Sequence, residues 1–125
     1  MKTLTKLILL AQTGITLNIG LGTFNSFAQT WAPMGTGMNS HVMSITGYKG
    51  AIYAGGFFTK ADGKTVNAIA KWDGTKWSSL GAGMSNIGMG GEFVTALAEY
   101  KGVLYAMGSF IMTDGLETSS IAKWY

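Results

Sequence analysis

The chain carries the stretch VMSITGYKGAIYAGGFFTKADGKTVNAIAKW at residues 42–72, and the stretch VTALAEYKGVLYAMGSFIMTDGLETSSIAKW at 94–124 aligns with it without a gap. Fourteen of the 31 aligned positions are identical, at a constant offset of 52 residues. A shorter match aligns WAPMGTGM (31–38) with WSSLGAGM (77–84) at an offset of 46 residues, and four of its eight positions are identical. The chain therefore contains a tandem repeat.

Each repeat is expected to form four short β-strands, because turn signals separate its apolar runs and no run has helical spacing. The fold class predicted is all-β, with antiparallel strands. The first two strands of the two copies are predicted at about 42–47 and 93–99, and at 51–58 and 103–110. The third strand is predicted at 68–72 and 120–124, and the fourth begins at Trp77.

The segment AKWDGTKW (70–77) predicts a hairpin between the third and fourth strands, with Asp73-Gly74 in the turn and Trp72 and Trp77 on its two arms. Contact between the two rings would hold the strands in register. Residues 31–38 are expected to be the fourth strand of a preceding unit, and Trp124 lies in a third strand whose fourth strand is missing. The only proline, Pro33, fits an outermost strand, where a missing amide donor costs least.

Residues 1–28 are predicted to be a secretory signal peptide. Lys2 and Lys6 precede an apolar run from Leu7, and small residues precede a cleavage site after Ala28. The alternative is a membrane anchor, but Gln12-Thr13-Gly14 and Asn18 interrupt the run before it reaches the roughly 20 residues that span a bilayer. We therefore expect a secreted or extracytoplasmic protein, in the periplasm or at the cell surface, with no stable membrane span after cleavage.

Charge and composition argue against several classes of partner. Loss of Lys2 and Lys6 would lower the formal net charge from +3 to +1, and the chain has no arginine. We therefore expect no nucleic-acid partner, since neither a basic stripe nor a bidentate phosphate clamp is present. The chain also has no cysteine, which rules out disulfides and thiolate metal ligands.

The stretch IYAGGFFTKADGKTVNAIAKWDGTKWSSLGAG (52–83) resembles secreted β-propeller repeats of the kelch and galactose-oxidase-like type, which follow roughly LYxGGxFT…NxIAxWDGxxWxxLGxG. Similar repeats occur in secreted bacterial proteins and fungal cortical cell-polarity markers. The resemblance implies a partial propeller over 29–125, with blade 1 at 42–83, blade 2 at 93–124 without its last strand, and 31–38 as the last strand of a preceding blade. A period near 50 residues agrees with propeller blades.

Two blades are fewer than a closed ring requires, since propellers have about four to eight. Two explanations stay open. The chain is a segment of a longer propeller, or several copies assemble into one ring.

The alternation of strand directions predicts that the loops at 59–67, 111–119 and 85–93 emerge at one edge, here called the loop edge, and that the tight turns emerge at the other. Loops carry function more often than scaffolds do. The candidate binding residues on the loop edge are Asp62, Lys64, Asn67, Asn86, Glu92, Asp114 and Glu117. The residues that could stack on a sugar are Trp72, Trp77 and Trp124.

We expect no catalytic residue, no metal site and no cofactor. His41 is the only histidine and lies in a short loop, and each predicted loop carries too few carboxylates to form a calcium site. The glycine-rich segment GMSNIGMGGEF (83–93) lacks the Lys-Ser/Thr ending of a phosphate loop. The copper-radical chemistry of galactose oxidase needs histidines and a cysteine that this chain lacks.

The sequence thus favours a non-enzymatic, secreted or surface-associated binding or scaffold module that is part of a larger propeller, with a protein or carbohydrate ligand that the sequence does not identify. The first alternative is a two-blade, lectin-like protomer that oligomerises into a ring. The second is a fragment of a propeller enzyme whose active site lies outside the chain.

Overall fold

The structure is a computed structural model that describes residues 17–18, 23–24, 29–85, 91–113 and 116–125. The chain divides into two compact units, Met1–Ala32 and Pro33–Tyr125. In the first unit, β1 (Leu17–Asn18) pairs with β2 (Thr23–Phe24) as a short antiparallel hairpin. The rest of the predicted signal peptide, 1–28, lies outside the described residues. Every regular element described is a β-strand, so the all-β prediction is confirmed.

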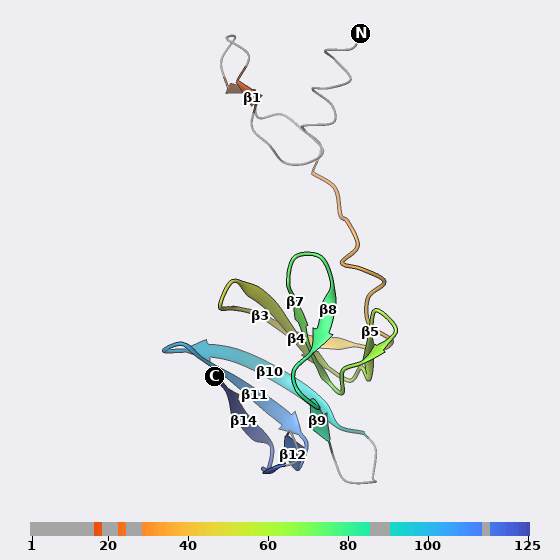
Figure 1. Ribbon diagram of the computed structural model, residues 1–125, viewed down its shortest axis with the longest axis vertical. Coiled ribbons are helices and arrows are strands. Elements are labelled where there is room, and N and C mark those ends of the chain that lie inside the picture. The colour runs from red at the N-terminus through yellow and green to blue at the C-terminus, as the bar shows by residue number, and fades with distance from the viewer. Residues whose placement is uncertain (1–16, 19–22, 25–28, 86–90, 114–115) are drawn as a thin grey trace. The chain divides into compact units, whose positions relative to one another are not determined.

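The second unit is built on two antiparallel sheets that follow the two repeats (Figure 1). Sheet 1 has the strand order β3-β4-β7-β8, with bounds Val42–Tyr48, Ala51–Gly56, Ile69–Trp72 and Trp77–Ser79. Sheet 2 has the order β10-β11-β14, with bounds Phe93–Tyr100, Val103–Ser109 and Ile121–Trp124. The four predicted strands of the first repeat and the three of the second are therefore present, each within a few residues of its predicted bounds.

The backbone of the first repeat recurs in the second. Ile45 pairs with Ala54 in sheet 1, and their equivalents 52 residues later, Leu97 and Ala106, pair in sheet 2. A bulge interrupts β3 between Val42 and Ser44, and β10 at the equivalent place. The positive φ angles also recur in pairs: 46° and 49° at Lys49 and Lys101, 74° and 76° at Gly50 and Gly102, and 68° and 60° at Ala68 and Ser120. The sequence repeat is therefore a structural repeat.

The loop edge differs from its prediction, because parts of the predicted loops form strands. One hairpin pairs β5 (Lys60–Ala61) with β6 (Lys64–Thr65). A three-stranded sheet has the order β13-β12-β9, with bounds Leu116–Glu117, Met112–Thr113 and Met84–Ser85. These pairings satisfy backbone groups that a longer irregular loop would expose.

Residues 31–38 form no strand, contrary to the prediction. Their pairing is limited to an isolated bridge between Met38 and Ala61. A strand is stable only beside another strand, and the third strand expected to pair with 31–38 is not among the described residues. Trp31 is fully exposed.

Each sheet has two faces of different composition. The face that we call the tryptophan face carries Ile45, Ile52, Ala54, Ala70 and Trp72 in sheet 1, and Leu97, Leu104, Ala106, Ala122 and Trp124 in sheet 2. The opposite, tyrosine face carries Tyr48, Tyr53, Gly55 and Ile69 in sheet 1, and Tyr100, Tyr105, Met107 and Ile121 in sheet 2. Alternation along each strand sends successive side chains to opposite faces.

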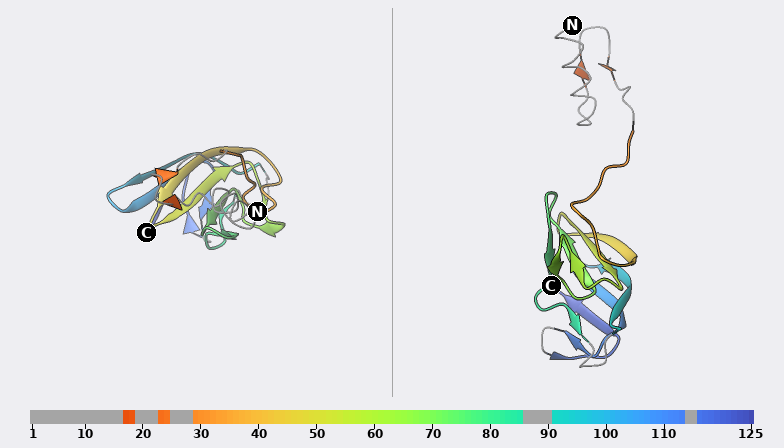
Figure 2. Two further views of the ribbon diagram at one scale, coloured as in Figure 1. Left: turned by 90° about the horizontal axis from the view of Figure 1, so that it is seen from above. Right: turned by 90° about the vertical axis from the view of Figure 1, so that its right-hand side faces the viewer.

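The tyrosine face of sheet 1 packs against the tryptophan face of sheet 2. The strand β10 lies beside β3 and β4 (Figure 2). Tyr48, Tyr53 and Ile69 lie in one buried cluster with Leu97, Leu104 and Ala106. The hydroxyl of Tyr48 donates to the carbonyl oxygen of Gly102 at 3.1 Å. The two sheets therefore have the same orientation in the stack, and the contact joins a tyrosine face to a tryptophan face.

Glycine is required where the bulges bring two strands close. A side chain at Gly56 would overlap the carbonyl oxygen of His41, and one at Gly108 would overlap that of Phe93. Both glycines lie at equivalent positions, so this close approach explains why the repeat retains glycine there.

The predicted hairpin is confirmed. Trp72 pairs with Trp77, and their ring centroids lie 5.3 Å apart. One carboxylate oxygen of Asp73 accepts from the backbone N–H groups of Thr75 and Lys76 at 2.8 and 3.0 Å. The Thr75 amide is the main cause that lowers the pKa of Asp73 to about 2. Ionised Asp73 therefore holds the turn that sets the register of the tryptophans.

Candidate functional site

The loop edge brings together the segments that the sequence assigned to it. Ser85 pairs with Met112, so the segment after β8 meets the connection between β11 and β14. The backbone N–H of Met84 donates to the carbonyl oxygen of Asn67 at 3.0 Å, which links the same segment to the equivalent connection of sheet 1. Two of the predicted binding residues, Asn86 and Asp114, lie outside the described residues.

Asp62 is engaged in structural hydrogen bonds. Its carboxylate accepts from the backbone N–H of Thr36 at 2.7 Å and from that of Trp77 at 3.2 Å. These bonds, led by the one from Thr36, lower the pKa of Asp62 below its ordinary value. Asp62 therefore ties the segment before β3 to β8, and its acceptor sites are largely used within the chain.

Asn67 has a similar structural role. It has a positive φ of 52°, a conformation that asparagine tolerates better than most residues. Its side-chain amide donates to the carbonyl oxygen of Ala82 at 2.8 Å. Of the remaining predicted residues, Lys64 and Glu117 are exposed and Glu92 is half-buried. Lys64 and Glu117 are therefore the most exposed of the predicted binding residues that the structure describes.

The three candidate tryptophans have different surroundings. Trp77 is buried, and its indole N–H donates to the carbonyl oxygen of Met34 at 2.8 Å. It therefore belongs to the core and offers no free ring face to a sugar. Trp72 and Trp124 are half-buried at equivalent positions on the tryptophan faces of the two sheets.

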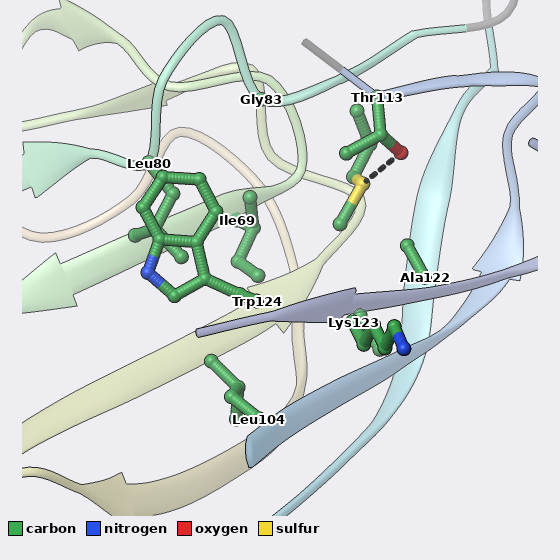
Figure 3. A pocket seen from close by; sticks show the side chains of 10 residues that line it. Ile69, Leu80, Gly83, Leu104, Thr113, Ala122, Lys123 and Trp124 are labelled. Atoms are coloured by element: carbon green, nitrogen blue, oxygen red, sulfur yellow. Dashed lines mark hydrogen bonds between the residues drawn. The ribbon is translucent and has the colours of Figure 1, made fainter. Parts of the chain in front are cut away.

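The cavity between the two sheets is small and apolar (Figure 3). Its volume is about 20 Å³, which is about enough for a single water molecule. Ile69 and Leu80 line it from the first repeat, and Leu104 and Trp124 line it from sheet 2. It is a packing gap in the junction and is too small for a sugar ring.

A larger hollow lies on the tryptophan face of sheet 1. Its volume is about 400 Å³, and its lining includes Met34, Met38, Val42, Ile45 and Trp77. It adjoins the exposed part of this face, which sequence reasoning did not single out as a site. The repeat alignment carries a signal for it, because apolar Ile45 is equivalent to Leu97. In the structure Leu97 is buried by the neighbouring sheet, whereas Ile45 is exposed.

The described residues form no candidate metal site. His41 is exposed, and its carbonyl oxygen accepts from the backbone N–H of Phe57 at 2.9 Å. Across the described residues, no three histidine, cysteine or carboxylate side chains cluster as a metal site. Nor do those residues include a helix long and apolar enough to cross a membrane.

Comparison with known protein families gave no match, and searches against characterised proteins and against solved structures gave no match either.

Proposed function

We propose that this chain is a secreted or surface-associated segment of a β-propeller of the kelch or galactose-oxidase-like type, with sheets 1 and 2 as consecutive blades, and that it acts as a non-enzymatic binding or scaffold module within a larger ring. The signal peptide at 1–28 and the extracytoplasmic location are part of this proposal. Its ligand would be held at the loop edge.

The observation that carries the proposal is the stacking of the two sheets. Two copies of one unit pack with unlike faces together, since the tyrosine face of sheet 1 covers the tryptophan face of sheet 2. A contact between unlike faces leaves a further face of each kind available, so it can be repeated from one unit to the next. A contact between like faces would end after two units. Repetition about an axis is how propeller blades form a ring.

Export is tested by expressing the full chain in a secreting bacterium and determining the N-terminus of the product. We expect the protein outside the cytoplasm, with Gln29 as its first residue. A full-length product confined to the cytoplasm would contradict the secretory part of the proposal.

A carbohydrate-binding protomer is the second candidate. It is favoured by Trp72, which is half-buried beside the partly exposed Ile52, and by the equivalent, half-buried Trp124. Trp77 is not part of it. The test is a glycan array probed with the full chain and with Trp72→Ala. Binding that the substitution removes would support the lectin, and a folded protein without binding to any glycan would favour a protein ligand.

A further inference from the structure

We propose that the chain associates head to tail with a second copy of itself: the tyrosine face of sheet 2 covers the exposed part of the tryptophan face of sheet 1 in the next copy, and residues 31–33 of that copy add to β14 as a fourth strand. This deepens the propeller proposal and rests on it in one respect, because it treats the junction inside the chain as the template for a junction between chains.

The first argument is that residues buried between the two sheets have equivalents that are exposed on the outer faces of the pair of sheets. On the tyrosine side, Tyr48 and Ile69 are 4% and 1% exposed, whereas Tyr100 and Ile121 are 61% and 54% exposed. The free tyrosine face is therefore the equivalent of one that the chain already buries against a tryptophan face.

The tryptophan side shows the same contrast. Leu97 and Leu104 of sheet 2 are 9% and 1% exposed, whereas their equivalents Ile45 and Ile52 of sheet 1 are 59% and 36% exposed. Among the described residues, the tyrosine face of sheet 2 and part of the tryptophan face of sheet 1 are thus exposed. The two faces lie on different sheets and carry exposed apolar residues equivalent to those buried at the internal junction, so a second copy can cover both.

The second argument concerns the edge of β14. In sheet 1, β8 pairs with the outer edge of β7, and Trp77 lies opposite Trp72. The described residues contain no strand that pairs with the corresponding edge of β14. Residues 31–33 are the sequence equivalents of 77–79 at the offset of 46 residues, and Trp31 is fully exposed. In the proposed junction Trp31 lies opposite Trp124.

The third argument is that residues 34–38 already occupy, on sheet 1, the position that residues 80–84 occupy on sheet 2. At the offset of 46 residues, Met34 and Met38 are equivalent to Leu80 and Met84, which pack in the cluster between the sheets. Met34 and Met38 pack on the cluster that contains Ala54, on the tryptophan face of sheet 1.

The backbone pairing agrees as well. The bridge between Met38 and Ala61 corresponds to the pairing of Met84 with Thr113 in the second repeat. Residues 77–84 form a strand of one sheet and then cross to the tryptophan face of the next sheet. Residues 34–38 therefore already lie where 80–84 lie in the second repeat. Residues 31–33 differ from 77–79 only in having no sheet to pair with among the described residues.

Two differences make the junction between copies weaker than the internal one. Met107 replaces Gly55, and a Cβ atom at Gly55 would overlap the side chain of Val94. The hydroxyl of Ser44 accepts from the backbone N–H of Leu97 at 3.0 Å, and the equivalent of Ser44 is Ala96, which has no hydroxyl. The association is therefore expected to be reversible and concentration-dependent.

The first test measures the mass of the full chain by sedimentation over a range of concentrations. We expect a reversible rise in mass, and Ile121→Asp should lower the association constant about tenfold or more by placing a charge in an apolar contact. Leu116→Asp is the matched control, because Leu116 is 72% exposed on β13 and lies outside both faces. Met107→Gly should strengthen association by removing the overlap.

The second test uses the absence of cysteine in the natural chain. Lys71 pairs with Ser78 in sheet 1, so their equivalents Lys123 and Ala32 should lie opposite each other between copies. Partners in an antiparallel pair are about 4.5–5.5 Å apart at Cα, which a disulfide can span. Mixing Lys123→Cys with Ala32→Cys should give a mixed disulfide, and mixing Lys123→Cys with Lys64→Cys should give far less.

A chain that stays monomeric at every concentration, or a mass that Ile121→Asp leaves unchanged, would overturn the proposal. So would association without the selective disulfide. None of these results would contradict the propeller proposal, since further blades of a longer polypeptide could then cover the same faces. That proposal fails separately, if an experimental structure shows the two sheets packed with like faces together.

Discussion

Tyr48 and Tyr100 test the packing of the two sheets within one chain, because they occupy equivalent positions in the two repeats. Tyr48 is buried in the junction, and its hydroxyl donates to the carbonyl oxygen of Gly102 at 3.1 Å. Tyr100 is 61% exposed. Each ring has the ammonium group of the following lysine near it, at 5.1 and 5.3 Å from the centroid, so this contact cancels in the comparison.

The expected costs follow from these contacts. Tyr48→Phe removes one hydrogen bond with a net value of about 0.5–1.5 kcal/mol. Tyr48→Ala also removes a buried aromatic ring, which costs about 3–5 kcal/mol. The same two substitutions at Tyr100 should change the free energy of unfolding by about 0.5 kcal/mol or less in the monomer, since surface substitutions are usually that mild.

The assay is urea unfolding followed by tryptophan fluorescence, at a protein concentration where sedimentation shows a single chain. A slope of about 1–3 kcal/mol per molar urea converts the loss at Tyr48→Ala into a midpoint shift of at least about 1 M. The two Tyr100 variants serve as matched controls. Equal shifts at the two positions would refute the reasoning, because the sheets would then not stack with unlike faces together.

Two further predictions concern backbone geometry and pH. Gly56→Ala and Gly108→Ala should each cost about 1–3 kcal/mol in the same assay, because a Cβ atom would overlap the carbonyl oxygen of His41 at the first position and of Phe93 at the second. Gly47→Ala is the control, because open space surrounds a Cβ atom there, and a result equal to the other two would contradict the explanation. Asp73 has its pKa lowered from 3.8 to about 2, so its contribution to stability is complete above pH 4 and is lost as the pH falls through 2. Asp73→Asn keeps an acceptor without the charge and should flatten this part of the pH profile of the unfolding midpoint, whereas parallel profiles would exclude Asp73 as the cause.

Much of the sheet structure could be predicted from the sequence. The Asp73-Gly74 turn and the facing Trp72 and Trp77 follow from local rules, because turn type and strand alternation depend on neighbouring residues. Residues 31–38, expected to be the fourth strand of a preceding unit, form no strand in the structure, because a strand needs a neighbour to pair with and the expected third strand is not among the described residues. The short strands of the loop edge were missed because each is two residues long, which is too short to show strand alternation, and because β9 pairs with β12, a strand distant in sequence.

The candidate site could be predicted only in part. Asp62 and Asn67 lie in the connection between β4 and β7, but their side chains are engaged with Thr36 and Ala82. Such bonds cross 26 and 15 residues of sequence, and no local pattern indicates them.

By itself the amino-acid sequence determined that the chain repeats, that the repeats are all-β, and where their main turns lie. Those properties depend on periodicity and on turn residues, which act over a few positions. Only the tertiary structure decided which face of one sheet packs on which face of the next, and so which apolar residues are left uncovered. Tyr48 and Tyr100 have the same local sequence, Tyr-Lys-Gly, and opposite exposure, because burial depends on what the rest of the molecule places against each face.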